Sequence, residues 1–444
     1  MRISDTSCSL LSHARRLVVL AEREGASEAE AFGTLGRSVD IDLRRDAVEL
    51  GSESFHCGLG VRAVVKGAVG FSSTSNMARL EDVARTAVRS ARVRGGDDAW
   101  RSLPLPESVR MVEGIRDPSL ERIGPEECLE MASSLLQGCA EVRGVRPVSG
   151  GVACAAGTSI VVNSHGIELQ ESSTLMHASM EAIAKEIDVA TGSEFLNSRS
   201  LQRSLEGVGR AAAQMAKRST GGTVAESGTF DVLLAPLAFA ELLEHTLIPS
   251  VSSENVQKGR SALAGRVGEP IASEELWVTD DGLLPGGMDS SGFDDEGVPS
   301  QRTVLIEAGL LRGYLFNSYT AGKAGVRSTG NAVRSGYADL PRVGIRNLIV
   351  ESPQAHDLYS ETRGYLVHGL IGAHTANPIS GDFSVEARNA FYVAEGDVVQ
   401  PIRSLMLAGN IFEALREISV GTDVRMVGGI VTPTVRVRLR VIGS

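Results

Sequence analysis

One glutamate–histidine pair has the spacing of metal-binding residues on a helix. Glu241 and His245 are four residues apart, so they share one face of a helix that is expected to begin near Pro236. Catalytic zinc requires about three protein ligands and an open coordination position. The chain has only eight histidines and contains neither an HExxH nor an HExxxH sequence. From spacing alone, a surface or capping contact is therefore the favoured interpretation, and a metal site is the minor alternative.

A second histidine pair stands in the C-terminal half. His368 and His374 flank a glycine-containing stretch, and Asp357 and Asp382 are near them in sequence. A metal site there is conceivable, because imidazoles and carboxylates are common metal ligands. The pattern favours the simpler interpretation of two unrelated histidines in turns.

Two polar loops carry the remaining candidate chemistry. Residues 289–296 concentrate carboxylates in a glycine-containing loop that could bind a cation, but they lack the spacing of an EF-hand. A solvated loop, or one whose carboxylates accept backbone N–H groups, is the favoured interpretation. Residues 328–331, Ser-Thr-Gly-Asn, could hold a peptide main chain through hydroxyls and an amide. Any tight turn uses the same residue types.

Glycine patterns do not indicate a nucleotide site. Gly58, Gly60 and Ala63 fit a loose dinucleotide-binding pattern, but they stand inside expected strands and not at a strand-to-helix turn. Strand-turn glycines are the favoured interpretation. Gly322-Lys323 is followed by alanine and lacks the first glycine of a P-loop.

Composition excludes several classes of protein. The chain has 444 residues and a formal charge of −11, which argues against a nucleic-acid-binding protein. It has no apolar run long enough to cross a membrane, and its N-terminus lacks the apolar segment of a signal peptide. All five cysteines precede residue 155, without a CxxC pair, which argues against a disulfide framework. We therefore expect a cytoplasmic protein without a membrane span.

The elements that must position these residues predict an α+β protein. Residues 1–100 are expected to form a two-layer domain of helices and sheet. Residues 101–222 are expected to form a middle segment of strands and helices, and residues 223–444 a β-rich, mostly antiparallel domain. The N-terminal elements are a helix over 10–21, a strand over 38–44, a strand pair within 58–71 that turns at Lys66-Gly67, and a helix over 77–93.

The later elements follow from the same periodicities. A loop over 95–116 precedes a helix over 126–138, and two or three strands within 145–175 are separated by Gly150-Gly151 and by a hairpin turn at 163–166. A helix over 201–218 follows. The C-terminal half contains a strand over 230–235, a helix over 237–248, a late helix near 411–418 and an alternating strand over 434–441.

Five blocks in order along the chain resemble the signature blocks of the TldD/PmbA family. Together they extend over nearly the whole chain, and their order makes the resemblance specific. The blocks are Gly58-Leu-Gly-Val-Arg62 with Gly67 and Gly70-Phe71, Phe293-Asp-Asp-Glu-Gly-Val298, residues 313–321 with Ser328-Thr-Gly-Asn-Ala332, Thr375–Ser384 and Leu407-Ala-Gly-Asn410.

This resemblance implies a branch of the family as well. The TldD branch resembles a zinc peptidase with an HExxxH helix and a later cysteine ligand, whereas the PmbA branch, also called TldE, lacks that site and pairs with TldD. In the same register this chain has Ala240, Glu241 and His245, and no cysteine follows Cys154. Alanine cannot coordinate zinc. The resemblance therefore implies a PmbA/TldE-like subunit without a metal or other cofactor of its own, and zinc in a TldD-like partner.

The family also implies a peptide substrate. We expect a cleft that admits unfolded peptides, which are degraded or trimmed by a heterodimer with a TldD-like subunit, or by a homodimer. Two alternatives stay open: an independent metallopeptidase that uses Glu241, His245 and a further ligand such as His368 or His374, and a peptide-binding regulatory homodimer. The candidate peptide-binding residues are Asp294, Asp295, Ser328, Thr329, Asn331, Asn377 and Asp382.

Overall fold

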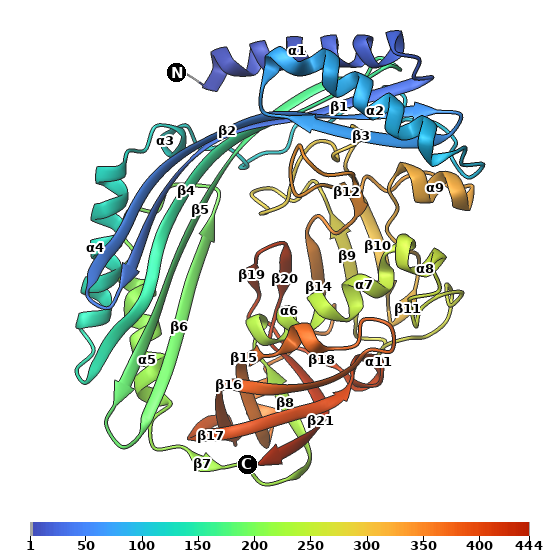
Figure 1. Cartoon of the computed structure of the whole chain (residues 1–444). Coiled ribbons are helices and arrows are strands. Elements are labelled where there is room, and N and C mark those ends of the chain that lie inside the picture. The colour runs from blue at the N-terminus through green and yellow to red at the C-terminus, as the bar shows by residue number, and fades with distance from the viewer. Residues whose placement is uncertain (1–2, 444) are drawn as a thin grey trace.

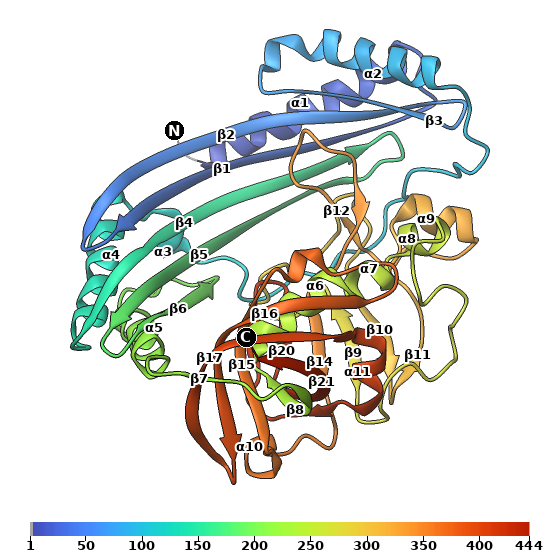
Figure 2. The same ribbon diagram turned by 60° about the horizontal axis from the view of Figure 1, so that its bottom comes forward.

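The computed structural model describes residues 3–443 and has the predicted α+β class. A long curved sheet arches over a β-rich C-terminal body, as both ribbon views show (Figures 1 and 2). No helix in the described part of the chain is both long and apolar enough to cross a membrane.

The curved sheet is antiparallel throughout, in the order β3-β2-β1-β4-β5-β6. Its β1–β2 and β4–β5 hairpins are far apart in sequence, yet β1 and β4 pair directly from Glu30↔Asn163 to Arg44↔Ser149. The expected turns at Lys66-Gly67 and at residues 163–166 are confirmed. The strands are β1 (Glu28–Arg44), β2 (Ala47–Val65), β3 (Ala68–Thr74), β4 (Val145–Asn163), β5 (Glu168–Lys185) and β6 (Val189–Ser198).

Helices cover the convex face of this sheet and leave its concave face to the C-terminal body (Figure 1). The predicted apolar face of α2 is buried against the sheet and α1, as amphipathic spacing requires. The helices of this part are α1 (Ile3–Arg23), α2 (Leu80–Arg94), α3 (Pro118–Glu121), α4 (Pro125–Ala140) and α5 (Glu206–Arg218), with a 3₁₀ turn η1 (Met77–Arg79).

The C-terminal body contains two larger sheets around one apolar core. In the first sheet, β21 pairs with both β8 and β17, which closes a ring of five strands. That sheet consists of β18 (Ser419–Val420), β21 (Val435–Gly443), β8 (Gly228–Leu234), β15 (Gly364–Ile371), β16 (Asp382–Ala394), β17 (Asp397–Asn410) and β7 (Thr223–Val224).

The second sheet packs beside the first. It is ordered β11 (Leu310–Leu311), β10 (Arg302–Glu307), β9 (Trp277–Asp281), β14 (Leu348–Glu351), β20 (Ile430–Thr432) and β19 (Arg425–Val427), and a separate ribbon joins β12 (Ala332–Val333) to β13 (Arg342–Val343). The helices are α6 (Pro236–His245), α7 (Leu247–Val251), α8 (Ser253–Gln257), α9 (Ser318–Ala324), α10 (Leu358–Glu361) and α11 (Ile411–Ala414), with η2 (Ala373–Thr375) and η3 (Leu415–Glu417). Helix α6 contacts strands of both sheets.

Two boundary predictions are wrong. Gly150-Gly151 does not separate strands, because β4 runs through it. A Cβ at either position would come within 2.5 Å of a carbonyl oxygen of a neighbouring strand, so these glycines allow close approach. The helix expected over 237–248 ends at His245. Pro249 has no N–H to continue the helical hydrogen bonds, and it is accommodated in the first turns of the separate helix α7.

Gly58 and Gly60 lie within strand β2, as expected from the sequence, and not at a strand-to-helix turn. A Cβ on Gly58 would lie 2.2 Å from the ring of Tyr337, and a Cβ on Gly60 would lie 2.0 Å from the backbone oxygen of the same residue. These two glycines therefore let the C-terminal loop that carries Tyr337 lie directly on the curved sheet.

We expect Gly60→Ala to lower the free energy of unfolding by about 1–3 kcal/mol, because the backbone of Tyr337 must move away. The matched control is Gly207→Ala in helix α5, where a new Cβ meets nothing within 4 Å. That change should be neutral or slightly stabilising. Urea denaturation of the two variants measures the difference, and equal midpoints would contradict the proposed close approach.

Candidate functional site

The helix positions that resemble a zinc site are occupied by other interactions. Ala240 is buried in the core at 2% exposure. The carboxylate of Glu241 accepts the backbone N–H of Leu370 at 2.6 Å, and the guanidinium of Arg388 on β16 donates to it at 3.2 Å. Burial raises the pKa of Glu241, although the N–H of Leu370 and the charge of Arg388 act in the opposite direction.

These residues do not fit a zinc ion in the HExxxH register. Ala240 supplies no ligand atom, and the positive charge of Arg388 already faces the carboxylate of Glu241. His245 is the last residue of α6 and is half-buried. Within residues 3–443, no three His, Cys, Asp or Glu side chains are grouped so that they could hold a metal ion.

The other two histidines lie in different environments. His368 is in strand β15, not in a turn, and its ring meets Phe391 edge-on with centroids 5.6 Å apart. Burial and the nearby charge of Arg218 lower the pKa of His368 to about 4. His374 is exposed in the short helix η2. The interpretation of both as turn histidines is therefore wrong for His368.

Most of the acidic loop is buried, although Asp289 at its start is exposed, and the carboxylates of Asp294 and Asp295 follow the backbone-binding alternative. Asp294 is fully buried and accepts the N–H groups of Glu296, Val298 and Ala332 at 2.9–3.0 Å. Burial and the adjacent charge of Glu296 raise the pKa of Asp294 to about 7. Asp295 accepts the N–H of Arg334 at 2.6 Å, and burial raises its pKa too. Both residues hold the loop together.

The next carboxylate of this loop joins the C-terminal body to the curved sheet. Glu296 pairs with Arg62 of β2 at 2.7 Å, and Arg62 also pairs with Glu30 of β1 at 2.8 Å. Arg334 donates to the other oxygen of Glu30. All four side chains are at most 4% exposed. Burial alone would raise the pKa of Glu296, but the charge of Arg62 and the hydrogen bonds from Ser318 and Arg62 together outweigh it and hold this pKa below its ordinary value.

The Ser-Thr-Gly-Asn segment forms a tight turn held by its own side chains. Thr329 Oγ1 donates to Asn331 Oδ1 at 2.6 Å and accepts the N–H of Phe316 at 2.7 Å. Ser328 Oγ donates to the carbonyl of Phe316 at 3.1 Å. Asn331 is buried and donates to Asp280 Oδ2 at 2.6 Å. The structure places Asn331 inside the protein, whereas Ser328 and Thr329 border an open cavity.

Asn377 and Asp382 lie in a separate place, at the turn that enters β16. Asn377 Oδ1 accepts the N–H groups of Ile379 and Ser380, and Asp382 accepts the hydroxyl of Ser380 at 2.6 Å and the amide of Asn410 at 2.8 Å. Both residues are exposed. The structure thus brings Asp294, Asp295 and the 328–331 turn together around β12, and leaves this pair apart from them.

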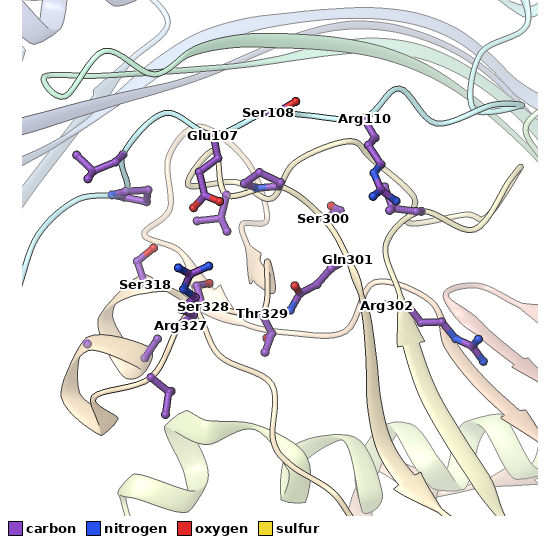
Figure 3. A pocket seen from close by; sticks show the side chains of 18 of the residues that line it. Glu107, Ser108, Arg110, Ser300, Gln301, Arg302, Ser318, Arg327, Ser328 and Thr329 are labelled. Carbon is purple, nitrogen blue, oxygen red and sulfur yellow. The ribbon is translucent and has the colours of Figure 1, made fainter.

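The cavity that Ser328 and Thr329 border has a volume of about 840 Å³. Figure 3 shows Glu107 and Arg110 extending from the segment before α3, with Arg327 on the opposite wall. This volume is within the range of pockets that bind small molecules or peptide segments. A smaller hollow beside α6 contains Arg388 and His368 and shares no lining residue with this cavity.

Comparisons with known proteins agree with this geometry. Residues 29–91, 118–220 and 227–443 match, in turn, domain 1, the central domain and the C-terminal domain of the PmbA/TldA metallopeptidases. The chain belongs to the PmbA/TldD family. The resemblance seen in the sequence is thereby confirmed.

Several family members match over most of their length. An uncharacterized protein of Methanocaldococcus jannaschii is 32% identical, and the alignment covers 95% of this chain and 97% of that protein. The metalloprotease TldD homolog of Haemophilus influenzae is 26% identical, and the alignment covers 89% of this chain and 85% of that protein. The crystal structure of TldE from Thermococcus kodakarensis is 25% identical, with a TM-score of 0.89, and covers 97% of this chain and 99% of its own.

Sequence reasoning missed the arginines that organise these sites. Arg62 and Arg334 neutralise the buried acids of the domain junction, and Arg388 meets Glu241. A signal existed for Arg62, since a charged residue within the apolar run of a PmbA/TldD sequence block requires a buried partner. Arg388 carried no such signal, because it stands next to the polar Asn389 and not within an apolar run.

We expect Arg62→Ala to lower the free energy of unfolding by about 3–5 kcal/mol, because it leaves Glu30 and Glu296 buried without their shared cation. Arg16→Ala is the matched control, since it removes an ion pair whose side chains are 60% and 62% exposed. That loss should stay below about 1 kcal/mol. Urea denaturation at neutral pH tests the difference, and similar midpoints for both variants would reject the junction as a major stabilising contact.

The raised pKa of Glu241 predicts a pH dependence. A carboxyl with a raised pKa binds its proton more tightly in the folded state, so stability falls as pH rises from the ordinary pKa through the raised one. Arg388→Met removes the positive charge beside Glu241 and should raise the pKa of Glu241 further. The free energy of unfolding should then fall more steeply with pH, and the fall should continue closer to neutral pH. Arg388→Lys keeps the charge and should resemble the unmodified protein. Unfolding free energies measured between pH 4 and 8 test this, and identical profiles for Met and Lys would contradict it.

Proposed function

We propose that this chain is the TldE-like subunit, without zinc of its own, of a TldD–TldE-type metalloprotease that degrades or trims unfolded peptides. The observation that carries the proposal is the helix α6 site. There the first ligand position is the buried Ala240, and Glu241 is held by Arg388 and by the N–H of Leu370. A single remaining imidazole cannot fix a catalytic metal.

The comparisons support this proposal from two directions. TldE from Thermococcus kodakarensis matches this chain over nearly all of both lengths. A family relative in Haemophilus influenzae carries the name metalloprotease TldD homolog. A TldD-like partner would supply the zinc and its nucleophilic water, while this chain would form part of the peptide-binding walls. Extended peptides offer unpaired main-chain groups that such walls can bind.

Metal analysis and peptidase assays test the proposal. We expect the purified chain to hold no stoichiometric zinc and to hydrolyse no unfolded peptide. A complex with a TldD-like protein from the same organism should contain zinc and cleave such peptides. Chelation of the zinc should abolish that activity, because the metal activates the attacking water.

A substitution separates the proposal from its rivals. His245→Ala in this chain should leave the peptidase activity of the complex unchanged, because within the described residues His245 belongs to no group of three His, Cys, Asp or Glu side chains that could hold a metal ion. An independent metallopeptidase would lose hydrolysis and metal together in the same variant. Stoichiometric zinc with activity in the isolated chain would overturn the proposal. A stable homodimer that binds no TldD-like protein would favour a regulatory peptide-binding role instead.

A further inference from the structure

The 840 Å³ cavity is bordered by polar side chains whose hydrogen-bonding capacity is unused. Among residues 3–443, no hydrogen bond or ion pair engages the side chains of Glu107, Arg110 or Arg327. Ser300 is 6% exposed, and its hydroxyl oxygen has no hydrogen-bond partner. Buried hydroxyls are normally hydrogen-bonded. These groups border one space, which indicates a ligand with several donors and acceptors.

The segment that forms one wall of the cavity also has backbone groups without hydrogen-bond partners. Residues 105–112 form neither helix nor strand, and none of their backbone groups makes a hydrogen bond within the described chain. The carbonyl of Arg110 lies against Gly292, where a Cβ would come within 2.4 Å of it. A peptide is a suitable ligand, because its own main chain offers matching N–H and C=O groups.

The charged side chains that border the cavity indicate which kind of peptide it would bind. Two unpaired guanidinium groups, Arg110 and Arg327, face the cavity from opposite walls together with one unpaired carboxylate, Glu107 (Figure 3). In contrast, Arg302 at the cavity edge is already paired with Glu351. An arginine binds a carboxylate through two parallel hydrogen bonds. Unpaired arginines in a chain of net charge −11 are thus matched to an anionic group from outside.

Apolar groups complete the walls. Leu105 and Val326 border the cavity and are 63% and 51% exposed. A peptide in the cavity would cover these two side chains and remove their apolar surface from water.

We propose that this cavity binds an extended peptide segment and that Arg110 and Arg327, on opposite walls, each pair with a carboxylate of that peptide. Each carboxylate is either an acidic side chain or the free C-terminus. This inference rests on the proposed role in handling unfolded peptides and adds to it a location and a charge preference. The site shares no lining residue with the hollow that contains Arg388 and His368.

Fluorescence anisotropy with the full chain, without a partner subunit, tests the proposal. The first probe is a fluorescein-labelled nonapeptide of alternating alanine and glutamate with an amidated C-terminus, and the second has lysine in place of glutamate. A third, all neutral, is used with a free and with an amidated C-terminus. We expect the glutamate peptide to bind more tightly than the lysine peptide, or the free C-terminus more tightly than the amidated one. A preference for the glutamate peptide would identify an acidic side chain as the source of the carboxylate. A preference for the free C-terminus would identify the terminal carboxylate.

Three variants locate the binding. Arg110→Gln and Arg327→Gln should each weaken binding of the preferred peptide about three- to tenfold, the effect of losing one charge-assisted hydrogen bond near solvent. Glu107→Gln removes a repelling charge and should strengthen the same binding. A gain in affinity cannot result from misfolding. Arg416→Gln changes the charge equally on an exposed residue outside the cavity and should have no effect.

Binding without charge preference, or unchanged by the cavity variants, overturns the inference. So does a chain that binds none of the probes. None of these outcomes affects the proposed subunit role, which depends on where the zinc and the hydrolysis reside. Conversely, zinc-dependent hydrolysis by the isolated chain would reject the subunit role and leave the measured peptide affinity as evidence for the cavity.

Discussion

The buried ion pairs among Glu30, Arg62, Glu296 and Arg334 hold the curved sheet to the C-terminal body. Four charges removed from water are costly unless each is matched, and here every carboxylate faces an arginine. The match requires strands β1 and β2, the acidic loop and the loop after β12 to be in place together. The glycines under Tyr337 let those loops reach the sheet. The orientation of the two halves depends on this junction.

Three of the five sequence blocks that mark the family meet at that junction and the acidic loop beside it. The first block supplies Arg62, the acidic block supplies Glu296, and the N–H of Ser318 in the next block donates to Glu296 at 2.8 Å. Ala332 of the same block donates to Asp294. The last two blocks meet each other through Asp382 and Asn410. Most of these blocks therefore preserve an architecture, and the cavity beside the 328–331 turn is formed by that architecture.

Helix α6 stands where the resemblance implies the zinc helix of the TldD branch, and its residues here make other interactions. Its glutamate is neutralised by a cation from the protein, Arg388, so the charge that a metal would balance is already balanced. The helix end can then stay packed between two sheets without a ligand. On our proposal, the peptidase chemistry belongs to the partner, and this chain contributes walls and binding surface.

The sequence by itself determined the α+β class, the apolar faces of the helices and the family, because periodicity and local motifs are short-range properties. It also identified Ala240 as a position unable to bind zinc. Only the tertiary structure decided that Gly150-Gly151 lies within a strand, that most of the acidic loop is buried, and that Arg388 reaches Glu241. Each of these depends on chain segments distant in sequence that share one space, and pairing over such distances leaves no local pattern to read.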